Sequence, residues 1–185
     1  DICFLDGGRG APQAVDTVET VCAMGVKKII AIGMCGTFSK NINVGDIIIP
    51  NKAYVEEGTS HHYYSSIDFS CPSNDLKCKL LDVLKFKNNV VFELPIVSTD
   101  AVYRQTFAKE RLWRDKGCVG VDMELSAVFS VSHYLNIDAA AIMLASDCHP
   151  LFEGDCDWAW ALSKNERFDF LSQCIDSILM SNLDR

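Results

Sequence analysis

The sequence predicts an α/β fold: a single domain with a central, mixed but largely parallel sheet and helices on both faces. Short apolar runs, typical of buried strands, alternate along the chain with segments whose apolar residues recur at helical intervals. No repeat, low-complexity tract or linker divides the 185 residues, so one domain is expected over residues 1–185. The chain is 49% hydrophobic and 23% charged, which suits a compact core and argues against disorder.

The predicted strands are runs rich in apolar and β-branched residues. They are Ile2–Asp6, Lys28–Met34, Ile47–Ile49, Ala53–Glu56, Val90–Ser98, Val119–Met123 and Ala139–Ala145. Lys28–Met34 contains an unbroken apolar run, which is typical of a strand covered on both faces. Ile2–Asp6 also has the pattern of a buried strand, so the chain opens within a strand and we expect a segment upstream of it.

The predicted helices share apolar residues at helical spacing. They are Ala11–Met24, Leu76–Leu84, Lys109–Lys116, Glu124–Leu135 and a final helix after Ser163. Gly25 is expected to end the first, because glycine favours the position that follows a helix. Ser163 and Glu166 have the spacing of a capping box at the start of the last. Its expected core face is Phe168, Leu171, Ile175, Ile178 and Leu179.

The charge and the cysteines exclude several classes of protein. With 17 Lys and Arg against 25 Asp and Glu, the net charge is −8, which disfavours a nucleic-acid polymer or an acidic membrane as partner. No apolar run is long enough to span a membrane and we expect no signal peptide, so a cytoplasmic protein is predicted. The nine cysteines are scattered, with no C-x-x-C pair. Buried free thiols, including Cys3, Cys22, Cys35 and Cys174, are expected rather than disulfides or zinc.

Ligands in such sheets bind beyond the carboxyl ends of the strands, so polar or glycine-rich strand ends are candidate sites. The first is Gly33-Met34-Cys35-Gly36-Thr37, whose glycines either admit a ligand close to the backbone or only turn a corner. The second is Ser98-Thr99-Asp100-Ala101-Val102-Tyr103-Arg104. Tyr103 and Arg104 either hold a flat hydrogen-bonding ring or serve as ordinary packing and surface charge.

The third strand end is Asp122-Met123-Glu124. Residues two apart in extended backbone face the same side, so Asp122 and Glu124 could converge on one ligand. Carboxylates accept hydrogen bonds from adjacent hydroxyls such as those of a ribose. A metal would need further ligands, which are not nearby in sequence. Alternatively, Glu124 is an acid placed at a helix N-terminus.

The fourth strand end is Ser146-Asp147, directly after an apolar strand. Desolvation there would raise the pKa of Asp147, which suits a carboxyl that donates a proton near neutral pH. The alternative is a loop Asp satisfied by backbone amides. His149 has no metal-ligand spacing with its neighbours, and His61 and His62 are expected in a loop, where one of them could contact a substrate.

In combination, these residues resemble the nucleoside phosphorylase and nucleosidase superfamily, which includes purine nucleoside and uridine phosphorylases and methylthioadenosine/adenosylhomocysteine nucleosidases. The resemblance extends from about Ile2 to Leu179. Its blocks, in family order, are Ile32-Gly33-Met34-Cys35-Gly36, Asn43-Val44-Gly45-Asp46-Ile47-Ile48-Ile49-Pro50, Glu56-Glu57-Gly58-Thr59-Ser60-His61-His62-Tyr63, Ser98–Arg104, Val121-Asp122-Met123-Glu124 with Ser126-Ala127, and Ser146-Asp147. The resemblance implies a phosphorylase/hydrolase-like fold and cleavage of the bond between a ribose and a purine base.

The resemblance also implies a role for each site residue. Asp147 would protonate the departing purine; Asp122, Met123 and Glu124 would bind the ribose; and the base would lie among Cys35, Gly36, Val102 and Tyr103. Neither a metal nor an organic cofactor is implied, and phosphate would be a co-substrate. The expected partners are a small-molecule nucleoside and further copies of the chain in a homo-oligomer.

Some positions depart from the family pattern. Ala31 and Met34 stand where phosphorolytic members usually carry an Arg and a Ser or Thr that bind phosphate. Arg9 could compensate, but the phosphate site stays unassigned. The family's N-terminal strand and phosphate loop are not visible in this sequence. Phosphorolysis is therefore the leading hypothesis, hydrolysis by a nucleosidase is second, and a non-catalytic nucleoside-binding or storage protein is the alternative of another class.

Overall fold

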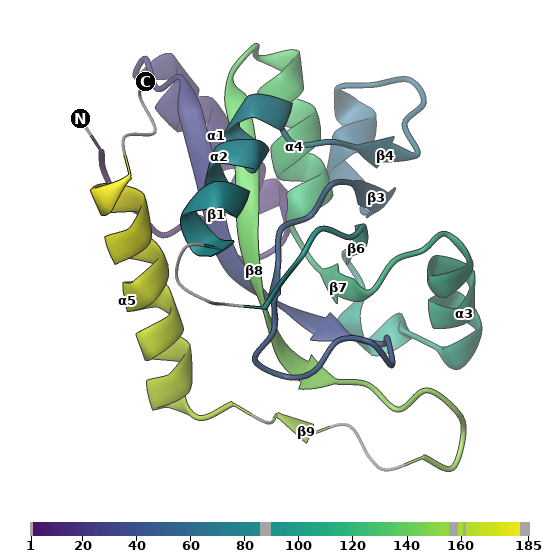
Figure 1. The fold of residues 1–185 in the computed structure, drawn as a ribbon. Coiled ribbons are helices and arrows are strands. Elements are labelled where there is room, and N and C mark those ends of the chain that lie inside the picture. Colours follow the sequence, from purple (N-terminus) through teal and green to yellow (C-terminus); the bar gives the residue numbers. More distant parts are fainter. Residues whose placement is uncertain (1, 86–89, 156–158, 161, 182–185) are drawn as a thin grey trace.

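The computed structural model describes residues 2–85, 90–155, 159–160 and 162–181 (Figure 1). The helices are α1 (Ala11–Ala23), α2 (Asn74–Lys85), α3 (Phe107–Asp115), α4 (Leu125–Tyr134) and α5 (Lys164–Met180), with 3₁₀ turns η1 (Thr59–His62) and η2 (Val102–Arg104). The strands are β1 (Lys28–Thr37), β2 (Ile47–Ile48), β3 (Ala53–Glu56), β4 (Phe69–Ser70), β5 (Val91–Phe92), β6 (Ile96–Thr99), β7 (Gly120–Asp122), β8 (Asp138–Cys148) and β9 (Ala159–Trp160).

The strands form one mixed sheet, as predicted. Its order is β4-β3-β6-β7-β1-β8-β2-β5, with β9 paired to β8. The parallel pairs are β3 with β6, β6 with β7, β1 with β8 and β2 with β5, while the other pairs are antiparallel. The long strands β1 and β8 therefore form the centre of the fold.

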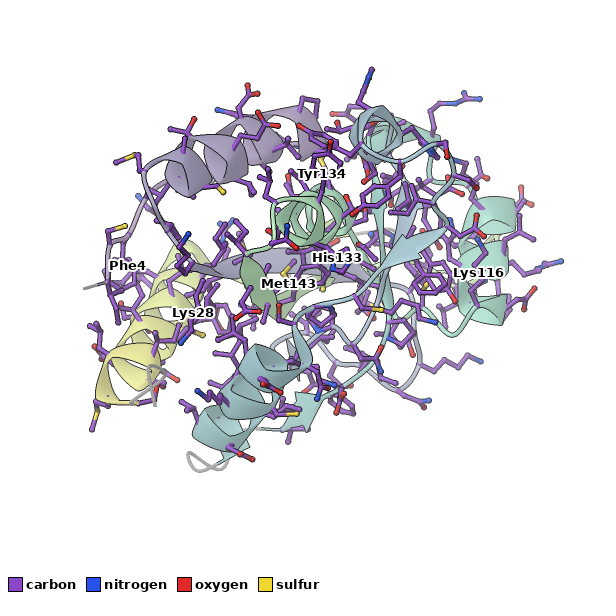
Figure 2. All side chains as sticks on the ribbon, turned by 90° about the horizontal axis from the view of Figure 1, so that it is seen from above. Phe4, Lys28, Lys116, His133, Tyr134 and Met143 are labelled. Carbon is purple, nitrogen blue, oxygen red and sulfur yellow. The ribbon has the colours of Figure 1, made fainter. Side chains whose placement is uncertain are left out.

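Helices cover both faces of the β1–β8 pair. Alternate side chains of β8 point to opposite faces of the sheet, so the strand contributes to a core on each side. Ala139, Ala141 and Met143 pack into one core with α1 and α4. Ala140, Ile142 and Leu144 pack into a second core with α2 and α5. Figure 2 shows this layering from above, with α1 and α4 on one side of the strands and α2 and α5 on the other. A third core, between α3 and the sheet, contains Phe38, Val97, Trp113, Cys118 and Val121.

The two halves of β1 have different surroundings. Residues 28–34 pair only with β8 among the described residues, and their side chains are exposed or half-buried. The prediction that this stretch is covered on both faces is partly confirmed, because Ile29 and Ala31 pack against one core and residues 30 and 32 pack against the other. Burial is incomplete, because the edge of β1 opposite β8 has no partner strand among the described residues. Gly36 and Thr37 pair with β7 as well as with β8, and Cys35 and Thr37 are buried.

The predicted strand Ile2–Asp6 is also wrong. These residues have no regular structure, and Ile2, Phe4 and Leu5 are each more than half exposed. An apolar run becomes a strand only when a neighbouring strand accepts its hydrogen bonds. Here the segment instead ends in a local turn, in which the Gly8 amide donates to Asp6 Oδ1.

The predicted strand Val90–Ser98 divides into β5 and β6. Pro95 lies between them and has no N–H to donate to a ladder, which explains the interruption. The other predicted strands and helices are present, with bounds shifted by a few residues. Helix α1 ends as predicted, because Gly25 adopts a positive φ of 97°.

Both hydrogen bonds of the predicted capping box at Ser163 and Glu166 are present at the start of α5. The predicted core face of this helix is only partly correct. Ile178 is buried, but Phe168 and Leu179 are more than half exposed. The side chains that α5 buries in the core also include Phe170 and Cys174, so the helix is rotated relative to the prediction.

None of the cysteines in the described part of the chain is in a disulfide. Cys35, Cys118 and Cys174 are buried, but the predicted burial of Cys3 is wrong, because the segment that carries it is exposed. Among the described helices, none combines the length and the apolar character that a membrane span requires.

Candidate functional site

Strand register brings the predicted site residues on β1, β7 and β8 together. Gly36 of β1 pairs with Val121 of β7 on one side and with Asp147 of β8 on the other. Asp122 and Asp147 thus lie on opposite sides of the end of β1, with Cys35 between them. Burial raises the pKa of the Cys35 thiol well above its usual range, and the charges of Asp122 and Asp147 raise it further. Cys35 is therefore a neutral, buried thiol.

Asp122 anchors the start of α4. Its Oδ1 accepts a hydrogen bond from the Ser98 hydroxyl, and its Oδ2 accepts from the amide of Leu125 at 2.8 Å and of Glu124 at 3.2 Å. Burial and the charge of Glu124 raise the pKa of Asp122 to about 7, although these hydrogen bonds oppose the shift. Both of its oxygens are thus engaged within the protein.

Glu124 connects two helices. Its Oε1 accepts a hydrogen bond from the Gly10 amide at 2.6 Å, and its Oε2 accepts from the Met123 amide at 3.2 Å. Gly10 precedes the first residue of α1, so the carboxylate of Glu124 lies at the positive end of that helix. Glu124 is the N-cap residue of α4, so the sequence alternative of a helix N-terminal acid is confirmed. Its side chain also contacts the start of a second helix, α1, through Gly10, which is 114 residues away in sequence.

Asp147 is 2% exposed at the end of β8. Its Oδ1 accepts a hydrogen bond from the Ser146 hydroxyl at 2.6 Å, and its Oδ2 lies 3.3 Å from His149 Nε2. A Cβ atom at position 36 would lie 3.0 Å from that Oδ2 and 2.5 Å from His149 Nε2. The glycine at position 36 therefore lets β1 pass close to the carboxylate and the imidazole.

His149 links Asp147 to α3. The other ring nitrogen of His149, Nδ1, lies 2.7 Å from Oε1 of the buried Glu110. Burial by itself lowers the pKa of His149, but hydrogen bonds and charge interactions with Asp147 and Glu110 raise it to about 9. The imidazole is therefore protonated at neutral pH and lies between two carboxylates. No sequence pattern singles out Glu110, which is 39 residues from His149.

The predicted base-binding residues Val102 and Tyr103 lie on η2. Val102 is half-buried, whereas the Tyr103 side chain is 96% exposed and is not enclosed by other residues. This segment is held to the neighbouring loop, because Asp100 Oδ2 accepts a hydrogen bond from the Gly58 amide at 2.8 Å. Of the predicted site residues, Tyr103 is the one that the structure leaves in solvent.

A buried carboxylate, that of Glu57, holds the loop that follows β3 through hydrogen bonds. Glu57 accepts hydrogen bonds from the Ser60 amide at 3.0 Å and from the Ser126 hydroxyl of α4 at 3.0 Å. Its side chain also contacts the Ser60 hydroxyl, which meets Ser130 of α4. His61 and His62 are exposed on η1, as expected for loop residues.

A groove of about 480 Å³ follows the open half of β1 and reaches Asp122 and Glu124. Its walls include residues 3–8, one face of α1, and Leu171 and Ile175 of α5. Figure 2 shows Phe4, in that N-terminal segment, near Lys28 and α5. The volume of the groove is within the range of small-molecule binding sites. Cys35, Gly36 and Asp147 do not line it, so in this structure Asp147 is shielded from the groove.

Among the described residues, no group of three or more His, Cys, Asp or Glu side chains is arranged to hold a metal ion. The arrangement at the end of β1 instead offers proton donors and acceptors: a buried carboxyl with a protonated imidazole, and a second, half-buried carboxylate on the groove wall. Such a set can protonate a leaving group and accept hydrogen bonds from hydroxyls.

The mixed α/β sheet with polar groups at its strand ends is a fold class shared by many enzymes. Comparison with known proteins identifies the family: residues 2–168 match the phosphorylase superfamily, and the chain belongs to it. It is 30% identical over 142 residues to a guanosine phosphorylase of Halorubrum lacusprofundi, covering 77% of this chain and 59% of that protein. It is 31% identical over 142 residues to a DeoD-type purine nucleoside phosphorylase of Clostridium novyi, covering 76% and 61%.

A further relative is an uncharacterized protein of Acanthamoeba polyphaga mimivirus, 29% identical over 151 residues, with 81% of this chain and 58% of that protein covered. The chain thus spans about three fifths of the length of these relatives.

Proposed function

We propose that the protein cleaves the N-glycosidic bond of a purine nucleoside and transfers the ribose to phosphate, giving the free base and ribose 1-phosphate. Family membership supports the reaction class, and the names of the guanosine and purine nucleoside phosphorylase relatives support the purine substrate. The observation that carries the proposal is the buried Asp147 carboxyl beside a protonated His149.

In this reaction Asp147 protonates a ring nitrogen of the base as the bond to the ribose breaks. The proton neutralises the negative charge that would otherwise develop on the base. General acid catalysis of this kind contributes about 10²–10⁴-fold, or roughly 3–5 kcal/mol of the barrier. Because Asp147 is 2% exposed, binding of the base requires a local rearrangement that uncovers the carboxyl.

Glu124 and Met123 bind the ribose. Glu124 lies on the groove wall and is half-buried, so its carboxylate can accept hydrogen bonds from the ribose hydroxyls. Its present bond to the Gly10 amide makes this residue sensitive to movement of the loop Gly7-Gly8-Arg9-Gly10 before α1. Asp122 contributes indirectly, because it holds the start of α4 and with it the Glu124 backbone. Cys35, Gly36 and Val102 would lie around the base.

A hydrolytic reaction is the second candidate, and one observation favours it. Ala31 and Met34 both line the groove and neither can bind phosphate, so an anion there lacks charge-assisted hydrogen bonds worth about 1.5–3 kcal/mol each. Lys28 also lines the groove, and Arg9 is exposed on the loop before α1, so either cation could replace them.

The experiment measures base release from guanosine by reversed-phase chromatography, with and without phosphate. Phosphorolysis predicts release that requires phosphate and yields ribose 1-phosphate. Release that is indifferent to phosphate would instead support the nucleosidase reaction. Guanosine binding without release, measured by calorimetry, would support a non-catalytic nucleoside-binding protein.

We further propose that the protein acts in the cytoplasm as a homo-oligomer and needs neither a metal nor an organic cofactor, with phosphate as the co-substrate. The open, half-exposed side of β1 supports self-association, because a sheet edge with apolar side chains is an unfavourable surface to leave in water. Light scattering of the purified protein tests this: a mass of 20.5 kDa would contradict it. Retention of base release after treatment with a chelator is the result expected without a metal.

A further inference from the structure

Glu110 and His149 form a buried pair, and the proposed reaction described above gives neither residue a step of its own. Glu110 is 3% exposed on α3, and His149 is 9% exposed just after β8. Glu110 Oε1 lies 2.7 Å from His149 Nδ1, and His149 Nε2 lies 3.3 Å from Asp147 Oδ2. The three side chains thus form a continuous chain from α3 to the proposed general acid.

The backbone fixes this geometry from several sides. The His149 amide donates to the Thr37 carbonyl oxygen at 2.7 Å, which holds the residue against the end of β1. The ring of Phe38 lies against the imidazole, at 6.4 Å between ring centroids. Gly36 leaves the space that the ring and the Asp147 carboxylate occupy. The imidazole therefore has little freedom to turn away from Asp147.

We propose that the Glu110–His149 pair is the proton reservoir of the site, with His149 supplying the proton that Asp147 delivers to the departing base and Glu110 positioning His149 for that transfer. The inference rests on the proposed function and extends it to residues on α3 and beyond β8. Both are positioning residues, because they act through Asp147.

The proton balance of the step is complete. Asp147 starts as a carboxylate. The Nε2–H bond of the His149 imidazolium breaks, its proton passes to Asp147, and Asp147 passes this proton on to a ring nitrogen of the purine. The electron pair of the broken glycosidic bond remains on the base. His149 becomes neutral and keeps its Nδ1 proton, which it donates to Glu110, so Asp147 and Glu110 both end as carboxylates.

The electrostatics favour this starting state. Among the described residues, the charged groups that contact the pair include Asp147 from β8 and Arg114 from α3, whose Nη1 lies 3.8 Å from Glu110 Oε2. The two carboxylates outweigh the cost of burial and raise the pKa of His149 to about 9. His149 is thus loaded with a proton at neutral pH, and removal of the Glu110 charge should lower its pKa.

The test compares two nucleosides. Guanosine needs a proton to release its base, whereas 7-methylguanosine already carries a positive charge on the base and leaves without one. For Glu110→Gln, we expect kcat/KM for guanosine to fall about 10²-fold, with the value for 7-methylguanosine unchanged. The matched control is Asp115→Asn, which removes one negative charge at an exposed position of the same helix and should change neither value.

A titration of the histidine ring signals by NMR gives a readout that does not depend on turnover. The His149 signal, assigned by its absence in His149→Gln, should titrate near pH 9 in the wild-type protein and at a lower pH in Glu110→Gln. Equal loss on both nucleosides, or no loss on either, would overturn the inference while the proposed function stands. Failure of the wild-type protein to cleave either nucleoside would contradict the proposed function, and the inference would fall with it.

Discussion

The two halves of β1 belong to one strand but have opposite environments. Residues 28–34 have one partner strand in the described structure, and their side chains are exposed or half-buried along a groove. Residues 35–37 lie between β7 and β8 and are largely enclosed. The polar groups that can do chemistry gather at the enclosed half, where Asp122 and Asp147 flank the strand.

Under the proposed function, this difference assigns ribose binding to the groove and proton transfer to the enclosed half. Enclosure desolvates carboxyl and imidazole groups and shifts their pKa values, which the open half cannot do. The open half instead offers an apolar groove wall, with Glu124 at the boundary between the two.

The largest expected effect on stability comes from truncating one member of a cross-strand pair, and the two members should differ in cost. Ile142 of β8 is fully buried, whereas its direct partner Ile32 on the open half of β1 is half-buried. We expect Ile142→Ala to lower the free energy of unfolding by about 2–5 kcal/mol. Ile32→Ala should cost about half as much, because the Ile32 side chain is already in contact with solvent in the folded protein. Urea denaturation of both variants measures the difference. Equal costs would mean that the open half is covered in solution.

Gly36→Ala tests the enclosed half. The added methyl would lie 2.5 Å from His149 Nε2 and 3.0 Å from Asp147 Oδ2. The ring would have to move, so we expect a loss of about 1–3 kcal/mol in stability and a larger separation of His149 from Asp147. Gly33→Ala is the matched control in the open half, because its nearest neighbours are the end atoms of Met143 at 3.4 Å. The account is wrong here if the two variants unfold at the same urea concentration.

Asp122 predicts a dependence of stability on pH. Its pKa rises from 3.8 in the unfolded chain to about 7 in the folded protein. Between these values the folded state keeps a proton that the unfolded state has lost, so this residue makes stability fall as pH rises from about 4 to about 7. Asp122→Asn cannot titrate and should lack this contribution. Parallel slopes of unfolding free energy against pH for the two proteins would contradict the shift.

Much of the fold could be predicted because local signals agreed with the final packing. The Ser163 and Glu166 spacing predicted the start of α5, and Gly25 predicted the end of α1. The prediction of a strand over Ile2–Asp6 was wrong, because an apolar run does not reveal whether a partner strand is present. The predicted core face of α5 was only partly correct for a related reason. Its apolar residues lie around more than one face, and the packing of the neighbouring helix and strands determines which of these side chains are buried.

The candidate site was predictable as a set of strand ends but not as a network. Register placed Gly36, Asp122 and Asp147 together, as the rule for strand ends implies. The contact of Glu124 with Gly10 and that of His149 with Glu110 join residues 114 and 39 positions apart. No local pattern announces such pairs, because they depend on how α1 and α3 dock.

Under the proposed function, the enclosed end of β8 carries the chemistry, and base release from guanosine by two variants of that strand tests this most directly. Asp147→Asn cannot donate a proton and should lower kcat/KM by about 10²–10⁴-fold. Asp138→Asn, at the exposed opposite end of β8, should retain the wild-type value. Near-normal turnover by Asp147→Asn would contradict the account.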